Sequence, residues 1–570
     1  MKQTIEYGEA GVQLVLLDPL EKVFPDETPV PSPLFASIEA LRGECASFQI
    51  AYSCAGFRAG ERTLHVKAAR VRVETPLGAA VHVRAVRCVP CEYPAHPNAD
   101  ANYLRKAPGL FPDRLEELPA GRVIFTAGQW KSLWLDVTAA PDAQPGTYPV
   151  RVTFEDEAAH APVASLETEV RILPALLPAQ TFPRTEWFYA DCLADHYGVE
   201  VFSEEHWRIL EAFIATAAKR GITMILTPQF TPPLDTAEGL ERTPVQLVGV
   251  KKTADGYTFD FTKLIRWFTM CRKCGVRYFE LSHLFSQWGA VAAPCIQAEV
   301  DGETRRIFGW DTPAVGGEYT RFLHAYLPQL RSLLRDMGLE DAAYFHISDE
   351  PHLSQIATYR AAKESIADVM AGCKFFDALS DLEFYRQGLV DRPVCATNHI
   401  APFLAAKTPG LWAYYCTAQG VDVSNCFLAM PGARTRIYGV QLYKFGIEGC
   451  LHWGYNFYNA MDSVYRVDPH CVTDCGGVYP GGDAFLVYPG ADGTPEESVR
   501  LLQLDEAMAD LRALQALEAK LGREKVLAVI DDGLETPLTF DVFPRRPQDR
   551  DYLLRLRARV NRLLCEPAAD

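Results

Sequence analysis

The sequence has 570 residues, 48% of them hydrophobic, and a formal net charge of −17 at pH 7. This length exceeds one compact core and predicts two or three domains. The acidic balance, together with the lack of a clear Lys/Arg patch, excludes nucleic acid and an anionic membrane surface as the main partners. A neutral or cationic small ligand fits this charge better.

Cysteine usage and the first residues predict where the protein resides. Sixteen cysteines are scattered along the chain. Cys88 with Cys91, and Cys271 with Cys274, have Cys-x2-Cys spacing, but no second pair lies at a zinc-site distance. We therefore expect buried thiols, no metal and no cofactor. No apolar stretch has the length of a signal peptide or a membrane span, so we predict a soluble protein of the reducing cytoplasm. The oligomeric state stays open.

Residues 1–178 are predicted to form an N-terminal β-sandwich. Alternating or apolar runs recur there between turn residues, with no convincing long helix, as is typical of two packed sheets. We expect this domain to give structural support. The proline-rich segment 94–119 predicts a long loop. The strand-like runs are 12–17, 46–52, 64–73, 81–86, 133–137, 148–154 and 166–173.

Residues 179–525 change to an alternation of strand and helix patterns, after a linker that contains three prolines. Amphipathic stretches such as 207–217 and 319–330 lie between several strand-like runs. Eight strands with intervening helices predict a (β/α)8 TIM-type barrel, closed by a long helix with an apolar stripe at 501–517. The strand runs are 185–189, 222–226, 278–281, 343–347, 374–378, 393–397, 411–415 and 449–453.

Residues 526–570 are predicted to be a C-terminal extension packed on the barrel. An apolar run at 526–530 favours a short strand. Residues 551–564 form a basic helical pattern, and we expect its arginines, Arg555, Arg557, Arg559 and Arg562, to make a solvated face.

Function in a barrel gathers at the carboxyl ends of the strands. Residues 344–351, Tyr-Phe-His-Ile-Ser-Asp-Glu-Pro, are a short apolar run that ends in two carboxylates and precedes a helical pattern. Asp349 and Glu350 are therefore the leading catalytic candidates. The other strand ends are rich in acids, amides and aromatics, which are the groups that a sugar site needs. Candidate substrate-binding residues are Asp191, His283, Asn398, Tyr414, Tyr415, Trp453 and Asn456.

Two adjacent acids raise a geometric question. Neighbours on a strand point to opposite faces, so both reach one pocket only if the chain turns there. Pro351 favours extended geometry at Glu350. Adjacent carboxylates are poorly placed to flank a scissile bond as nucleophile and acid. They suit substrate-assisted catalysis, in which one acid orients the substrate's 2-acetamido group. The other acid protonates the departing oxygen and then activates water.

The motif His-Ile-Ser-Asp-Glu-Pro at 346–351 resembles the Asp-Glu motif of glycoside hydrolase family 123, the β-N-acetylgalactosaminidases. The blocks at 451–456 and 482–489 are similar to others in that catalytic domain, and the likeness covers about residues 180–520. The resemblance implies a retaining exo-glycosidase for terminal β-linked N-acetylhexosamine, with N-acetylgalactosamine preferred, acting through an oxazolinium intermediate. Asp349 would orient the acetamido nitrogen and Glu350 would be the general acid/base. The implied partner is an oligosaccharide or glycoconjugate substrate.

Position alone suggests the remaining roles. Trp453 would lie under the sugar ring, and Tyr414 or Tyr415 would hold the acetamido oxygen. Two alternatives stay open. One is a barrel glycosidase for a sugar without an acetamide, with Asp191 or Asp377 as nucleophile. The other is a catalytically inactive glycan-binding homologue.

Overall fold

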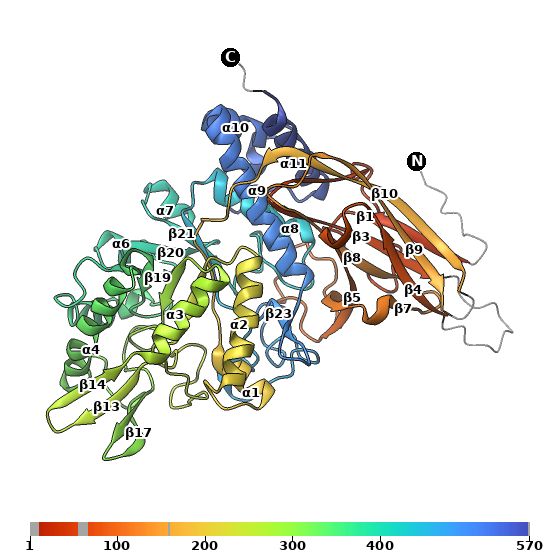
Figure 1. The fold of residues 1–570 in the computed structure, drawn as a ribbon. Helices are drawn as coiled ribbons and strands as arrows, with labels where there is room; N and C mark the ends of the chain where they lie inside the picture. Colours follow the sequence, from red (N-terminus) through yellow and green to blue (C-terminus); the bar gives the residue numbers. More distant parts are fainter. Residues whose placement is uncertain (1–10, 55–66, 158–159, 568–570) are drawn as a thin grey trace. The chain divides into compact units, whose positions relative to one another are not determined.

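The computed structural model describes residues 11–54, 67–157 and 160–567. The chain forms two compact units (Figure 1). The first comprises residues 1–180, 424–444 and 496–570, and the second comprises 181–423 and 445–495. The domain boundaries at 178 and 525 stay a prediction.

The first unit contains two five-stranded sheets, and every strand-like run predicted before residue 178 lies in one of them. Residues 64–66 of one run fall outside the described part. Large apolar residues such as Phe48, Leu135 and Phe154 are fully buried in a shared core. One sheet has the order β1 (Val12–Leu17), β3 (Glu44–Cys54), β8 (Lys131–Ala139), β5 (Val81–Cys91), β6 (Gly109–Glu117). The other has the order β2 (Ile38–Arg42), β10 (Pro162–Leu176), β9 (Gly146–Asp156), β4 (Lys67–Glu74), β7 (Arg122–Phe125).

The prediction of one long loop at 94–119 was wrong for its second half, which forms β6. Pro112 lies inside this strand. A proline cannot donate to a sheet and is tolerated at an edge or a bulge. Strand β6 is an edge strand, and its register with β5 shifts beside Pro112. The fold therefore accommodates the residue that made the sequence resemble a loop.

The second unit contains a closed barrel of eight parallel strands, as predicted. Each strand overlaps one of the eight predicted runs, and most of the strand residues are buried. Because the strands are parallel, the carboxyl ends of all eight strands lie at the same end of the barrel. The strands are β11 (Arg184–Glu186), β12 (Met224–Thr227), β15 (Tyr278–Leu281), β18 (Ala343–Phe345), β19 (Lys374–Leu379), β20 (Arg392–Ala396), β21 (Trp412–Tyr415) and β22 (Gly449–His452).

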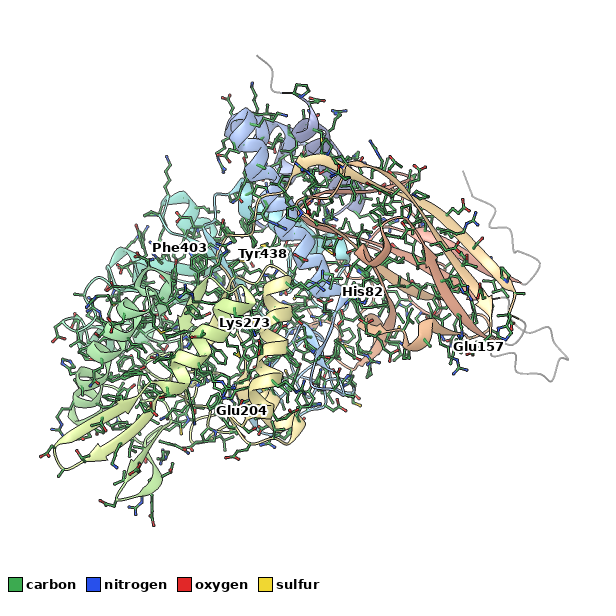
Figure 2. The ribbon with its side chains drawn as sticks, in the orientation of Figure 1. His82, Glu157, Glu204, Lys273, Phe403 and Tyr438 are labelled. Atoms are coloured by element: carbon green, nitrogen blue, oxygen red, sulfur yellow. The ribbon has the colours of Figure 1, made fainter. Side chains whose placement is uncertain are left out.

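Helices alternate with these strands along the chain, which makes the fold a (β/α)8 barrel. α2 begins where the Ser203 side chain accepts from the backbone N–H of His206, and it buries its apolar stripe. Its opposite face is polar: Glu204 and Glu211 of α2 form ion pairs with Arg266 and Lys273 of α3 (Glu204 and Lys273 are labelled in Figure 2). In the described part of the chain, no helix is long and apolar enough to cross a bilayer. The helices up to β21 are α1 (Ala190–Tyr197), α2 (Glu204–Lys219), α3 (Thr262–Cys274), α4 (Gly317–Asp336), α5 (Ile356–Glu364), α6 (Glu383–Arg386) and α7 (Ala401–Ala405).

Two hairpins that the sequence analysis did not predict interrupt the barrel's early repeats. They are β13 (Gly249–Thr253) with β14 (Gly256–Asp260), and β16 (Ile296–Val300) with β17 (Glu303–Phe308), joined in one sheet. The second hairpin turns at Asp301-Gly302, and both residues have positive φ. Asp-Gly is the dipeptide that a two-residue hairpin turn favours. This local signal was present in the sequence.

The remaining helices belong to the first unit: α8 (Gly432–Lys444), α9 (Val499–Leu521), α10 (Arg523–Asp531) and α11 (Arg550–Cys565). The predicted strand at 526–530 was wrong, because α10 buries Val526, Val529 and Ile530, which share one helical face. The basic helix is confirmed as α11. Arg557 does not belong to a solvated face, since it forms ion pairs with Glu44 and Asp510 in the interior.

Candidate active site

A pocket at the carboxyl ends of the barrel strands contains both leading candidates. Its volume is about 110 Å³. A single water needs about 10–15 Å³ on this scale, so the space suits one sugar ring and not an extended glycan. Six of the fourteen lining residues are aromatic and three are acidic, the composition expected of a sugar site. The lining residues are Trp187, Tyr189, Asp235, Gln287, Trp288, Asp349, Glu350, Ala378, Tyr414, Cys416, Thr417, Leu451, Trp453 and Tyr479.

Asp349 and Glu350 reach the same pocket because the chain turns at Glu350. Strand β18 ends at Phe345, and Glu350 has a left-handed φ of 41°. The expected extended geometry at Glu350 was therefore wrong, even though a proline follows. The turn is held by two backbone hydrogen bonds, from Glu350 N to the carbonyl of Ala378 (3.1 Å) and from Trp288 N to the carbonyl of Asp349 (2.9 Å). Left-handed non-glycine residues cost of order 1–3 kcal/mol and cluster at functional sites.

The two carboxylates have different surroundings. The Tyr414 hydroxyl donates a hydrogen bond to Glu350. Asp349 Oδ1 is buried and has no hydrogen-bond partner among the described residues. Burial and, next, the neighbouring charge of Glu350 raise the pKa of Asp349 well above its ordinary value. Asp349 therefore offers an unused polar atom that a ligand N–H would satisfy.

A buried chain of charged groups holds one wall of the pocket. Trp187 donates its indole N–H to Glu280 Oε1 (2.6 Å), and the same oxygen contacts His346 Nε2 at 2.6 Å. His346 Nδ1 lies 2.8 Å from Asp377. Burial opposes the charge on His346, but its hydrogen bonds to Asp377 and Glu280 raise its pKa to about 9. Asp377 also accepts from the Ile347 backbone N–H (3.2 Å), so the network orients Trp187 and the segment that leads to Asp349.

A second chain of the same kind holds Trp453. Its indole N–H donates to Asp483 Oδ2 at 2.9 Å, and Asp483 Oδ1 lies 3.5 Å from His452 Nε2. His452 Nδ1 contacts Glu186 at 2.8 Å, and Arg184 binds the other oxygen of Glu186. Burial lowers the pKa of His452, but the two carboxylates outweigh it and raise the pKa to about 9. Trp187 and Trp453, two of the three tryptophans that line the pocket, are thus each tied to a buried carboxylate beside a charged histidine.

The predicted site residues fall into two groups. Asp349, Glu350, Tyr414 and Trp453 line the pocket together. Tyr415, Asn398, His283, Asp191 and Asn456 do not line it.

Each residue of the second group has another place in the unit. Tyr415 is buried against the ring of His452, and exposed Asn398 accepts from the Gln419 side chain. Asp191 forms a buried ion pair with Arg242 at 3.0 Å. Asn456 bonds both the N–H and the carbonyl of Tyr189 at 2.9 Å, so it supports a pocket wall.

His283 packs against the ring of Trp187 and, with His346 and Asp377, is the one metal-like group within the described residues. The two imidazole rings stack at 3.9 Å with an angle of 14°. Stacked rings direct their nitrogen lone pairs side by side and not toward a common point. Both His346 nitrogens already contact carboxylates. This group therefore does not fit a metal ion.

Sequence reasoning missed several pocket residues. Trp187 and Tyr189 lie at the first predicted strand and its end, but nothing marked their role. Gln287 and Trp288 follow β15 by six and seven residues. Asp235 and Tyr479 come from long loops with no recognisable motif. Only the folded loops bring these side chains to the strand ends.

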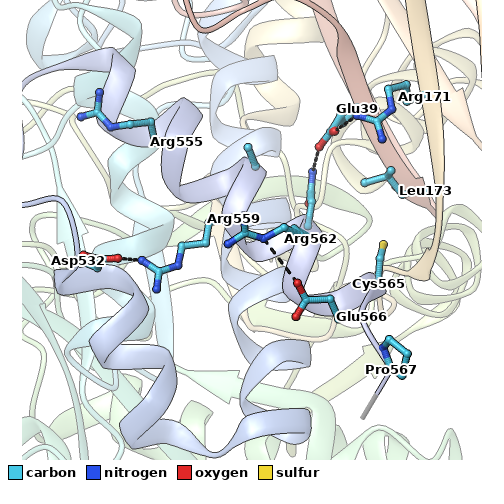
Figure 3. A pocket seen from close by; sticks show the side chains of 12 residues that line it. Glu39, Arg171, Leu173, Asp532, Arg555, Arg559, Arg562, Cys565, Glu566 and Pro567 are labelled. Carbon is cyan, nitrogen blue, oxygen red and sulfur yellow. Dashed lines mark hydrogen bonds and ion pairs between the residues drawn. The ribbon is translucent and has the colours of Figure 1, made fainter. Parts of the chain in front are cut away.

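The first unit contains a larger hollow of about 1000 Å³ beside α11 (Figure 3). Four arginines line it, and three of them pair with acids that also line it: Arg559 with Asp532, Arg171 with Glu39 at 2.9 Å, and Arg562 with Glu566 at 3.6 Å. Among its described lining residues none is aromatic. The hollow therefore lacks the flat apolar surface on which a sugar ring stacks.

Comparisons with known proteins show which family and which solved structure this chain is similar to. The model of the family described as "Glycoside hydrolase 123, catalytic domain" matches residues 187–517. The solved structure of a family 123 glycoside hydrolase from Clostridium perfringens is similar with a TM-score of 0.70 and 12% identity, over 97% of this chain and 98% of that one. This likeness shows the same fold, a sheet-rich domain before a (β/α)8 barrel.

Other solved structures are far less similar. A glycosyl hydrolase family 2 member from Bacteroides cellulosilyticus has a TM-score of 0.27 and 10% identity, over 81% of this chain and 49% of that one. The β-glucuronidase of Ruminococcus gnavus has a TM-score of 0.29 and 8% identity, over 86% and 76%. Structures with such low TM-scores support no conclusion about this chain. No curated protein matches this sequence.

Proposed function

Because this chain belongs to glycoside hydrolase family 123, we propose that it is a retaining exo-glycosidase for terminal β-linked N-acetylhexosamine, with N-acetylgalactosamine preferred. The observation that carries the proposal is the pair Asp349 and Glu350 in one pocket of single-sugar size, with Trp187 and Trp453 in its walls. The substrate would be an oligosaccharide or a glycoconjugate. The Clostridium perfringens protein is described in terms of glycolipid glycan hydrolysis, which supports a glycan substrate of that class.

The proposed reaction is substrate-assisted. Glu350 donates a proton to the glycosidic oxygen while the carbonyl oxygen of the 2-acetamido group attacks C1, and the bond from C1 to the leaving oxygen breaks. The product is a cyclic oxazolinium ion. Glu350 then takes a proton from a water molecule as the water oxygen attacks C1. The bond from C1 to the acetamido oxygen breaks, which opens the oxazolinium ring and leaves the sugar ring intact. Two displacements at C1 retain its configuration.

Asp349 suits the acetamido nitrogen. Its Oδ1 lacks a hydrogen-bond partner in the described chain, and the acetamido N–H supplies a donor. A donor at this oxygen favours the ionised form, because hydrogen bonds to a carboxylate stabilise its charge. The ionised Asp349 then stabilises the positive charge that develops on the nitrogen. Tyr414, which donates to Glu350, orients the acid/base.

The two acids considered as distant nucleophiles are less suited to that role. Asp377 is fully buried and is bound by His346, Tyr359 and the Ile347 N–H. Asp191 is buried and paired with Arg242. Neither lines the pocket. Substrate assistance is therefore favoured over a mechanism for sugars that lack the acetamide.

The test compares aryl β-glycosides of N-acetylgalactosamine, N-acetylglucosamine and galactose, and assays Glu350→Gln and Asp349→Asn. We expect turnover of the acetamido substrates only, and a loss of about 10²–10⁴-fold in either variant. The loss in Glu350→Gln should be smaller when the leaving group is an activated phenol, because such a group departs without a proton. Equal hydrolysis of the galactoside would overturn substrate assistance, and full activity of Asp349→Asn would do the same. Glycan binding without turnover of any substrate would indicate an inactive homologue.

A further inference from the structure

A third acid lines the pocket, and the proposed reaction does not use it. Asp235 lies on the long connection between β12 and β13. Its Oδ1 accepts a hydrogen bond from the Tyr479 hydroxyl at 3.1 Å. Its Oδ2 is buried and finds no partner in the described parts of the chain. Asp235 therefore presents one occupied and one unused acceptor oxygen.

The surroundings hold Asp235 rigidly. Its backbone N–H donates to Gln287 Oε1 at 2.7 Å, and its carbonyl accepts from Ser463 Oγ at 2.7 Å. Its φ of 45° lies in the left-handed region, which a non-glycine residue adopts only when its neighbours impose it. The unused oxygen is thus kept in place before any ligand binds.

The nearby cation does not neutralise this carboxylate. Arg242 pairs with Asp191 and lies over the ring of Tyr189, 4.9 Å from its centre. Its charge lowers the pKa of Asp235, but burial is the larger effect and raises that pKa to about 6. Asp235 is therefore ionised at neutral pH and lacks an ion-pair partner within the described residues.

A phenol completes the group. Tyr189 lines the same pocket, and its hydroxyl is buried and has no hydrogen-bond partner among the residues described. Burial raises its pKa well above the ordinary value, and the charges of Asp235 and Asp349 add to that shift. The phenol thus stays protonated and lies in the field of both acids. It is a hydrogen-bond donor on a residue that lines the pocket together with the catalytic pair and Asp235.

We propose that Asp235 and Tyr189 form a subsite for the ring hydroxyls of the terminal sugar, at the side of the ring away from C1 and C2. This inference rests on the proposed function, in which C1 faces Glu350 and the acetamido group at C2 faces Asp349. The donors that remain on the ring are the hydroxyls at C3, C4 and C6. Asp235 Oδ2 accepts from one of them, and the Tyr189 hydroxyl donates to the same or the neighbouring oxygen. This subsite would distinguish hexosamines by the position of those hydroxyls.

The test uses Asp235→Asn and Tyr189→Phe with the aryl β-glycoside of the preferred hexosamine and its 3-, 4- and 6-deoxy analogues. A hydrogen bond to a charged group corresponds to about a 10–100-fold effect on kcat/KM. We expect Asp235→Asn to lower kcat/KM for the full substrate by that factor. With the wild-type protein, kcat/KM for one of the deoxy analogues should be lower than for the full substrate by a similar factor. With Asp235→Asn, the same analogue and the full substrate should have equal kcat/KM. Tyr189→Phe should behave likewise with a smaller loss.

Asp195→Asn is the matched control. Asp195 is a nearby acid that pairs with Arg466 at 2.8 Å and does not line the pocket, so its kcat/KM should stay within about two-fold of wild type. The subsite is refuted if Asp235→Asn retains wild-type kcat/KM on every substrate, or if all three deoxy analogues react like the parent sugar.

Other outcomes separate this inference from the proposed function. If Asp235 were a nucleophile, Asp235→Ala would lose turnover of all substrates, and added azide would restore it with an inverted glycosyl azide product. That result would overturn both proposals. If the wild-type protein cleaved only sugars without the acetamide, the proposed function would fail. The subsite would then be judged on the deoxy analogues of the sugar that is cleaved.

Discussion

Replacing Asp235 with Asn is expected to stabilise the ligand-free protein at neutral pH. Burial raises the pKa of this carboxyl from 3.8 to about 6, so keeping it ionised at pH 7.5 opposes folding. The difference of about two pH units, at about 1.4 kcal/mol each, sets an upper limit of about 3 kcal/mol. Asn keeps an oxygen for the Tyr479 hydroxyl and carries no charge, so this unfavourable free energy is removed.

The pH dependence has a defined sign. In the unfolded chain the carboxyl ionises near 3.8, whereas in the folded protein it holds its proton until about pH 6. Between these values the unfolded chain binds fewer protons, so the contribution of Asp235 to stability becomes less favourable as the pH rises. It levels off above about pH 6. The advantage of Asp235→Asn should therefore be near zero below pH 4 and complete at pH 7.

Scanning calorimetry of both proteins at pH 4.5 and 7.5 measures this effect. For a unit of about 300 residues, 3 kcal/mol corresponds to a rise in Tm of about 5 °C at pH 7.5. The gain at pH 4.5 should be much smaller. Asp195→Asn, which loses its ion pair with Arg466 and has no unused buried oxygen, should show no gain. An unchanged or lower Tm of Asp235→Asn at pH 7.5 would show that the ionised Asp235 carboxylate does not destabilise the folded protein.

Three further predictions test the packing and the charged networks. Asp483→Ala removes the acceptor of the Trp453 indole N–H, so kcat/KM should fall about tenfold or more, mainly through a higher KM. Asp483→Asn should recover part of the lost kcat/KM. An unchanged KM in Asp483→Ala would contradict the positioning role of Asp483. Gly439→Ala would place a methyl group in collision with the backbone oxygen of Ala507 on α9 and should therefore lower Tm, despite alanine's better helix propensity. A Tm equal to that of the wild type would exclude so close an approach of the two helices. The pKa values of His346 and His452 are raised from 6.5 to about 9 in the folded protein, so the charged histidines stabilise the fold fully below pH 6.5 and lose this effect as the pH rises through 9. We therefore expect Tm to fall between pH 7 and 10. A Tm that does not change over this range would refute the charged networks.

The two histidine networks explain why the pocket walls need buried charge. An indole N–H that faces a pocket can rotate away or lose its partner to water. A buried carboxylate fixes it, and a charged histidine makes that carboxylate tolerable in the interior. Glu280 and Asp483 perform this task for Trp187 and Trp453. The sequence analysis named Asp377 only as a possible nucleophile of the alternative glycosidase, and its supporting role became visible with its partners His346, Tyr359 and Ile347.

Local patterns were sufficient for most elements. The eight barrel strands and the amphipathic helix α2 follow from the period and burial of apolar residues, which neighbouring residues determine. The failures are also local in origin. The run Val526–Ile530 is short enough to fit a strand or one helical face. Pro112 made an edge strand resemble a loop.

The sequence by itself determined the class of fold and the location of the acid pair, because strand order along the chain and the six-residue motif at 346–351 are both properties of short segments. It did not determine the direction of Glu350, which a left-handed turn and the carbonyl of Ala378 decide. Only the tertiary structure brought Tyr189 and Asp235 to the acids at Asp349 and Glu350. Their proximity depends on loops whose ends are set by barrel closure, and no pattern within a short segment encodes contacts across more than a hundred residues.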